Sequence, residues 1–237
     1  MAGLPGAEQI ILAVDSSDED RALELVQIAE EAGASTVKLG LELATATDWE
    51  FCSGIAERHG LQWVADAKLD DIPNTVVGAV KNLAALPHPP FAITMHTTAG
   101  IEAMTKAQEA AGVIKMLGVT ILTSVTPEEA EETYGVSRLT MVKKLAHNAV
   151  KSGLAGVVAS PKEVGALKDD AITGGLFAMI PGTRPKWAAA NDQANVELPR
   201  VAIEAGADAL VIGRPITGAE KPAEAFARLI SEIRGEA

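Results

Sequence analysis

The residues best suited to chemistry lie in one short segment, Asp66–Thr75, which reads Asp-Ala-Lys-Leu-Asp-Asp-Ile-Pro-Asn-Thr. The apolar run before it predicts a buried strand, and the residues after it show a helical pattern. Because side chains alternate along a strand, Asp66 and Lys68 are expected on one face at the strand's end. Asp71 follows in a loop, where Ile72 precedes a proline and is held extended. An isolated Asp-x-Lys pair is compatible with a structural ion pair, but a surface pair is worth only about 0–1 kcal/mol. The crowding of charges here favours a site that uses them.

The composition is typical of a soluble globular protein. The chain has 237 residues, of which 48% are hydrophobic and 22% charged, and (β/α)8 barrels of about 250 residues form single domains. A net charge of −12 argues against a nucleic-acid surface, although a single phosphate needs only a local positive pocket. One cysteine, Cys52, excludes an intramolecular disulfide. No signal peptide or long apolar run is evident, so a cytoplasmic protein that does not contact a membrane is predicted.

Short apolar runs alternate with longer amphipathic segments along the chain. The predicted strands are Ile10–Val14, Thr36–Leu39, Gln62–Ala67, Phe91–Met95, Ile114–Leu122, Gly156–Ala159, Leu176–Ile180 and Ala209–Ile212. The predicted helices are Asp18–Ala32, Ala44–His59, Asn74–Ala85, Gly100–Ala111, a split pair across Pro127–Ser152, Pro161–Lys168, Leu198–Ala205 and Lys221–Arg234. Eight strand–helix units predict the α/β class and a single (β/α)8 TIM barrel domain over residues 1–237. A doubly wound open sheet shares the alternation, but the count of eight favours the barrel.

Charged and polar residues recur where the predicted strands end, which is where such barrels carry their active sites. These residues are Asp15, Lys38, Asp66, Lys68, His96, Ser124, Pro181 and Arg214. Each has a simpler interpretation when taken alone. Asp15 or Ser124 can cap a helix, Lys38 can extend along a strand edge, and a histidine at a strand end is more often structural than catalytic. Together, the aspartates and lysines predict an alternating carboxylate–ammonium array whose members keep one another ionised.

The segment Asp66–Thr75 resembles the active-site string Asp-x-Lys-x-x-Asp-Ile-Pro-Asn-Thr of the orotidine 5'-phosphate decarboxylases. Other segments resemble that family in the same order, from about Ile10 to Phe226. They are Val37–Glu42 in the second strand and the phosphate-binding segments Pro181–Pro185, Asn191–Gln193 and Val211–Thr217. The combination covers nearly the whole chain and is much more specific than any of its parts except the central string.

The resemblance implies that orotidine 5'-monophosphate is decarboxylated to UMP in pyrimidine biosynthesis, without a metal or organic cofactor. Lys68 matches the lysine that stabilises the C6 carbanion and supplies the proton, and Asp66 matches the aspartate beside the departing carboxylate. Asp15 and Lys38 match residues that hold the ribose hydroxyls and extend the charge network. Asp71 matches an aspartate delivered by the second subunit of a homodimer.

The resemblance also implies the remaining contacts. Ile72 and Thr75 come from the same loop of the second subunit, and Ser124 contacts the amide edge of the pyrimidine. Pro181, Arg184, Gly213 and Arg214 belong to the loops that bind phosphate, which backbone amides and a bidentate arginine suit well. Gln193 bridges phosphate and pyrimidine across a closing loop. Residues 186–190 show no strand period and few apolar partners, so this loop is expected to move.

Two other readings share part of this pattern. Magnesium-dependent decarboxylases or aldolases of keto-sugar phosphates have the same barrel and Asp-x-Lys-x-x-Asp core, but they need an acidic metal ligand and lack the Ile-Pro-Asn-Thr continuation at Ile72–Thr75. A non-catalytic phosphate-binding scaffold would be expected to have lost some charges, whereas Asp15, Lys38, Asp66, Lys68 and Asp71 are all present. The decarboxylase is therefore favoured.

Overall fold

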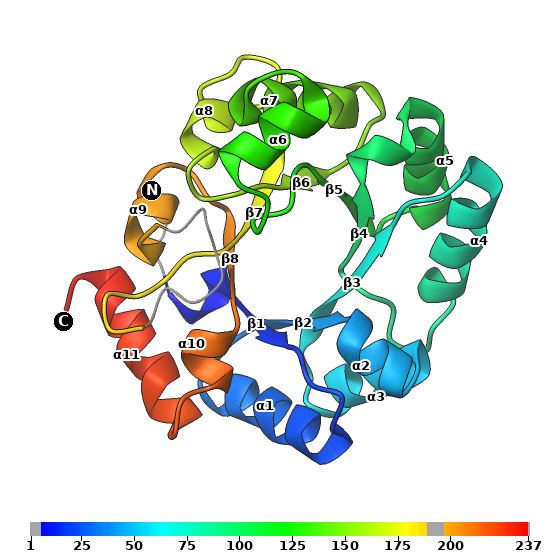
Figure 1. Cartoon of the computed structure of the whole chain (residues 1–237). Coiled ribbons are helices and arrows are strands. Elements are labelled where there is room, and N and C mark those ends of the chain that lie inside the picture. Colours follow the sequence, from blue (N-terminus) through cyan, green and yellow to red (C-terminus); the bar gives the residue numbers. More distant parts are fainter. Residues whose placement is uncertain (1–5, 189–196, 237) are drawn as a thin grey trace.

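Eight parallel strands close into a barrel in chain order, with β1 paired to β8 (Figure 1). The computed structural model describes residues 6–188 and 197–236. The strands are β1 Ile10–Val14, β2 Thr36–Gly40, β3 Gln62–Leu69, β4 Ala92–His96, β5 Lys115–Val119, β6 Gly156–Val158, β7 Phe177–Pro181 and β8 Ala209–Ile212. The predicted α/β class and TIM barrel are confirmed.

Helices surround the barrel and cover the outer face of its strands (Figure 1). They are α1 Glu19–Glu31, α2 Leu41–Ala46, α3 Trp49–Arg58, α4 Pro73–Ala84, α5 Ile101–Ala111, α6 Pro127–Tyr134, α7 Arg138–Lys151, α8 Val164–Lys168, α9 Pro199–Glu204, α10 Arg214–Thr217 and α11 Pro222–Arg234, with the short 3-10 helices η1 Ala7–Gln9 and η2 Thr97–Ala99. Among the described residues, no helix has the length and apolar character that crossing a membrane requires.

The apolar strands serve two separate cores, as expected for a sheet that is buried on both faces. The larger core lies between the strands and the helices and contains large side chains such as Trp63 and Phe226. The smaller core fills the barrel interior. It comprises Ile11, Ala13, Val64, Ala92, Leu117, Met179, Ala209 and Val211. These interior layers leave the carboxyl ends of the strands free to carry polar side chains.

Two predicted elements differ most from the structure, and several other ends differ by one to three residues. The fifth strand ends at Val119 rather than Leu122. Thr120 still directs its N–H (3.1 Å) and its hydroxyl (2.9 Å) to the carbonyl of Val158, but the β5–β6 pairing ends at Val119 and Val158. The helix predicted over Ala44–His59 is two helices, because the Asp48 carboxylate accepts the N–H of Phe51 (2.7 Å) and begins α3 anew.

The connection between α6 and α7 follows the prediction of a split pair. Thr126 and Glu129 form a capping box at the start of α6, which ends at Gly135 in the left-handed region (φ 69°). Ser137 then caps α7 by accepting the N–H of Thr140. The turn between α6 and α7 is thus bounded by a left-handed glycine on one side and a helix cap on the other.

Candidate active site

A cavity of about 390 Å³ opens at the carboxyl ends of the strands. It collects eight of the residues predicted from the sequence, which come from β2, β3 and β7 and from the segments that follow β1, β7 and β8. These residues are Asp15, Lys38, Asp66, Lys68, Pro181, Arg184, Gly213 and Arg214. Closing the barrel therefore brings together side chains from widely separated parts of the chain, as the sequence predicted.

Four of the charged side chains form a continuous chain of ion pairs on one side of the cavity. Nζ of Lys38 lies 2.8 Å from Oδ1 of Asp15 and 3.1 Å from Oδ2 of Asp66. Nζ of Lys68 lies 2.6 Å from the same Oδ2 of Asp66. Gly40 leaves room for this arrangement, because a Cβ at that position would lie 3.0 Å from Nζ of Lys38. The alternation Asp15–Lys38–Asp66–Lys68 matches the predicted array.

The array keeps its buried members charged. Burial raises the pKa of a carboxyl group, but the positive charges of Lys38 and Lys68 outweigh that effect and lower the pKa of Asp66 to about 2. Burial likewise lowers the pKa of an ammonium group, yet Asp66 and Asp15 hold the pKa of Lys38 above its ordinary value. Asp66 is therefore a carboxylate and Lys38 an ammonium ion at neutral pH.

The backbone of β3 is irregular where it delivers these groups. The pairing register with β4 shifts between Ala65 and Leu69, and Lys68 adopts a positive φ of 45°, a conformation that is uncommon for residues other than glycine. Thr94 of β4 holds the bulge, because its hydroxyl accepts the N–H of Lys68 (3.0 Å) and donates to Oδ1 of Asp66 (2.8 Å). Thr94 was not predicted from the sequence, where its one signal is a polar residue within the apolar run Phe91–Met95; in the structure it is fully buried.

Cationic side chains lie on another part of the same cavity. Arg184, in the loop after β7, and Arg214, the first residue of α10, both line it. Gly182 and Gly213 line the cavity beside them, and Gly182 has a positive φ of 83°. The arginines are suited to an anionic group, because a guanidinium forms bidentate contacts with phosphate oxygens.

Comparisons with known proteins agree with this geometry. Residues 8–229 match the profile of the Orotidine 5'-phosphate decarboxylase / HUMPS family. The chain is 36% identical to the orotidine 5'-phosphate decarboxylase of Syntrophomonas wolfei, over 95% of this chain and 98% of the relative. It is 39% identical to that of Synechococcus sp. WH7803, over 97% and 96% of the two chains.

The chain belongs to the orotidine 5'-phosphate decarboxylase / HUMPS family. It groups with the decarboxylases, which are carboxy-lyases of pyrimidine biosynthesis. A crystal structure of orotidine 5'-phosphate decarboxylase from Lactobacillus acidophilus superposes with a TM-score of 0.79 at 29% identity, covering 95% of this chain and 99% of that one.

Three predicted residues of this family member lie outside the cavity lining. Asp71, Ile72 and Thr75 are exposed in the loop after β3 and the first turn of α4. The Asp71 carboxylate accepts the N–H of Ile72 (2.6 Å), and among the described residues it forms no ion pair with Lys68. The array within one protomer thus ends at Lys68, and the assignment of Asp71 to the site of a second subunit stays a prediction.

One further predicted residue, Ser124, also lies elsewhere in this decarboxylase-family chain. Ser124 lies five residues beyond the end of β5 and lines a neighbouring pocket with Val125 and Glu129, whereas Thr123 lines the central cavity. The prediction that Ser124 directly follows the fifth strand is therefore wrong. Gln193 lies outside the residues that the structure describes.

The loop after β7 differs from expectation at Trp187. This side chain packs against the edge of the main core, and the guanidinium of Arg228 lies over its ring at 4.9 Å. The expectation that residues 186–190 lack packing partners is therefore wrong at this position.

His96 ends β4 and is half-buried beside the array. Burial lowers its pKa, and Lys68 acts in the same direction against the opposing carboxylates of Asp70 and Asp66. Its side chain is not part of the cavity lining. Across residues 6–188 and 197–236, no three His, Cys, Asp or Glu side chains are grouped so that they could hold a metal ion.

Proposed function

We propose that this cavity converts orotidine 5'-monophosphate to UMP and CO2, with Lys68 as the catalytic acid. The observation that carries the proposal is the contact between Nζ of Lys68 and the buried carboxylate of Asp66 (2.6 Å), in a cavity that also contains Arg184 and Arg214. The arginines are suited to bind the phosphate. The Asp15–Lys38–Asp66–Lys68 array is then available to the pyrimidine ring, where the reaction takes place.

The proposed reaction needs no electron acceptor. The bond between C6 and the carboxylate carbon breaks, CO2 leaves, and the electron pair remains on C6. Lys68 donates a proton to C6 and is reprotonated from solvent. An ammonium fixed in advance by Asp66 stabilises negative charge on carbon without reorganising as the charge develops, and binding the nucleotide in place removes a large entropic cost.

Asp66 contributes by its charge and its rigidity. It is buried, with both oxygens engaged by Lys38, Lys68 and Thr94, so it remains ionised beside the incoming carboxylate. Lys38 and Asp15 complete the network and, by the resemblance, hold the ribose hydroxyls. The repulsion between the carboxylates of Asp66 and the substrate disappears when CO2 leaves.

The proposed active unit is a homodimer with shared sites. Ile72 is 67% exposed, which is unusual for a large apolar side chain that follows an active-site strand. Its neighbours Asp71 and Thr75 are exposed as well. Burial of this loop against a second subunit would place a carboxylate near the open end of the array, where Lys68 retains partial exposure.

The direct test is the loss of the orotate chromophore when the purified protein meets orotidine 5'-monophosphate. We expect turnover that is unchanged after EDTA treatment and dialysis, because the charges that act on the substrate are those of Lys68 and Asp66. Turnover lost with EDTA and restored by Mg²⁺ would instead favour the metal-dependent branch of the family. A protein that binds UMP without turnover would favour the scaffold reading.

Replacing Arg214 by alanine is expected to lower kcat/KM by at least about tenfold. Remote contacts with a phosphate supply binding energy that is used at the reacting carbon, so kcat should fall together with the apparent affinity. Steady-state kinetics with orotidine 5'-monophosphate and with orotidine measure the effect, and the substitution should matter little for orotidine. A value within about threefold of wild type, less than 1 kcal/mol, would contradict the role of Arg214.

A further inference from the structure

The loop between β5 and α6 forms one wall of the cavity through Ile121, Leu122 and Thr123. It contains neither helix nor strand, and Leu122 is 40% exposed. A loop without regular secondary structure must be held by other contacts if it is to fix the position of a rigid ring.

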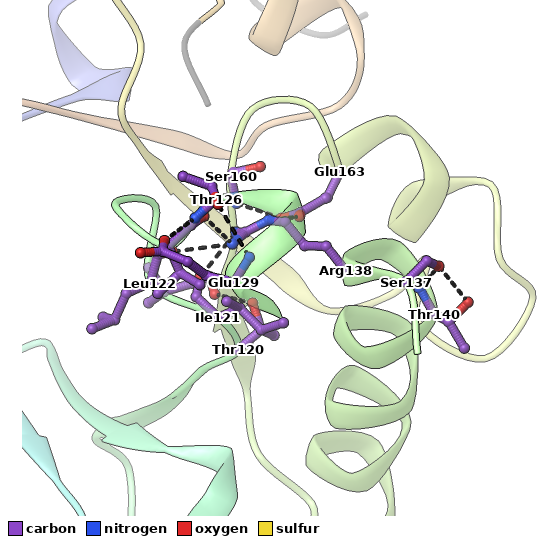
Figure 2. Close-up of polar contacts among 12 residues, drawn as sticks. Thr120, Ile121, Leu122, Thr126, Glu129, Ser137, Arg138, Thr140, Ser160 and Glu163 are labelled. Atoms are coloured by element: carbon purple, nitrogen blue, oxygen red, sulfur yellow. Dashed lines mark hydrogen bonds and ion pairs between the residues drawn. The ribbon is translucent and has the colours of Figure 1, made fainter. Parts of the chain in front are cut away.

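Arg138 supplies these contacts to the loop. It begins α7, is only 6% exposed, and directs its guanidinium at the backbone of the loop (Figure 2). Nη1 donates to the carbonyls of Leu122 (3.2 Å) and Val125 (2.9 Å), and Nη2 donates to the carbonyl of Ile121 (3.2 Å). One planar group therefore fixes the loop over most of its length.

Glu163 joins the same guanidinium to a second part of the wall. Its Oε1 accepts from Nε of Arg138 (2.6 Å), and its Oε2 accepts the N–H of Ser160 (3.0 Å) (Figure 2). Ser160 directly follows Ala159, which lines the cavity with Val158. A single buried ion pair thus couples the loop after β5 to the loop after β6.

A contribution to the stability of the fold does not by itself explain why this position holds an ion pair. A basic residue in the first turn of a helix is opposed by the helix dipole. Both members are almost completely buried, at 6% and 4% exposure, and apolar residues of similar size often replace such pairs without loss of stability. What an apolar pair cannot supply is a planar fork of donors matched to several carbonyl groups.

We propose that Arg138 and Glu163 are positioning residues that set the shape of the base-binding wall. This inference rests on the proposed function, since it assigns the wall formed by Ile121, Leu122 and Thr123 to the pyrimidine. The pair acts through the loop and touches no substrate atom. Its loss lets the wall move away from the ring, so that the nucleotide is held less accurately over Lys68.

The deciding variant is the double substitution Arg138→Met with Glu163→Met, which removes both charges and leaves neither unpaired. We expect a folded protein whose melting temperature falls, because the carbonyls of Ile121, Leu122 and Val125 lose their donor. We also expect a kcat/KM at least tenfold lower, with a raised KM for orotidine 5'-monophosphate. A folded double variant whose kcat/KM stays within twofold of the wild-type value would show that the pair serves folding alone and would overturn the proposal. The exposed pair Arg200–Glu204 of α9, substituted in the same way, is the matched control and should leave kcat/KM within twofold.

Conservative single variants keep the test decisive if the double variant does not fold. Arg138→Lys keeps the charge but loses the fork, and Glu163→Gln can no longer accept from both Arg138 and Ser160. In each we expect faster amide exchange of residues 121–126, partly reversed by UMP, together with reduced kcat/KM. Faster exchange with unchanged kcat/KM, or reduced kcat/KM without faster exchange, would contradict the proposal. Wild-type protein without turnover would contradict the proposed function instead, and the exchange data would still show whether the pair orders the loop.

Discussion

Replacing Lys68 by alanine is expected to lower decarboxylation below one hundredth of the wild-type rate while leaving the fold intact. General acid catalysis alone is typically worth about 10²–10⁴-fold, and in the proposed mechanism the same ammonium also stabilises the carbanion. The fold should survive because Asp66 keeps its ion pair with Lys38 (3.1 Å) and its hydrogen bond from Thr94 (2.8 Å). No buried charge is then left without a partner.

Single-turnover measurements with saturating orotidine 5'-monophosphate, together with a melting curve, would separate the two effects. The matched control is Lys106→Ala, which removes an exposed lysine that pairs with Glu102 on α5 (2.7 Å), and it should leave turnover unchanged. If Lys68→Ala retained a tenth of the wild-type turnover, the assignment of Lys68 as the acid would be wrong.

Mixing two inactive variants, Lys68→Ala and Asp71→Ala, is expected to restore activity. In a two-fold symmetric dimer with shared sites, each hybrid has one site with both substitutions and one site with neither. Equal mixing with free exchange makes half of the dimers hybrid, so about a quarter of the wild-type activity should return. The exposure of Asp71, Ile72 and Thr75 in one protomer is what motivates this expectation.

The control for this experiment is a mixture of Lys68→Ala with Asp66→Asn. Both residues belong to the array within one protomer, where Nζ of Lys68 lies 2.6 Å from Oδ2 of Asp66. Their hybrids therefore contain no intact site and should stay inactive. Subunit exchange is verified by mass spectrometry of differently labelled chains. Proven exchange without recovery in the first mixture would exclude the sharing of Asp71 between subunits.

The strand order and most of the array could be predicted from the sequence because both depend on local patterns. Alternation along β2 and β3 places Lys38, Asp66 and Lys68 at one rim once the barrel closes. The end of β5 could not be predicted in this way. Ile121 and Leu122 are apolar because they line the cavity and its wall, and in the sequence they are indistinguishable from two more strand residues.

Contacts between distant segments were also beyond the sequence pattern. Thr94 binds Asp66 and Lys68 only because β3 shifts register against β4, and no glycine or proline within the bulge announces the shift. Arg138 resembles an ordinary surface residue at a helix start. Its burial depends on two loops, after β5 and β6, that meet only in the folded barrel.

The left-handed backbone at Lys68 sets a limit on engineering this enzyme for heat resistance. A non-glycine residue at φ 45° costs of order 1–3 kcal/mol, so design methods that reward stability alone will favour glycine or asparagine at this position. Such a sequence would lack Lys68, the proposed acid. Selection for thermal tolerance and selection for turnover therefore pull this position in opposite directions, and a stabilised variant has to gain its stability elsewhere in the barrel.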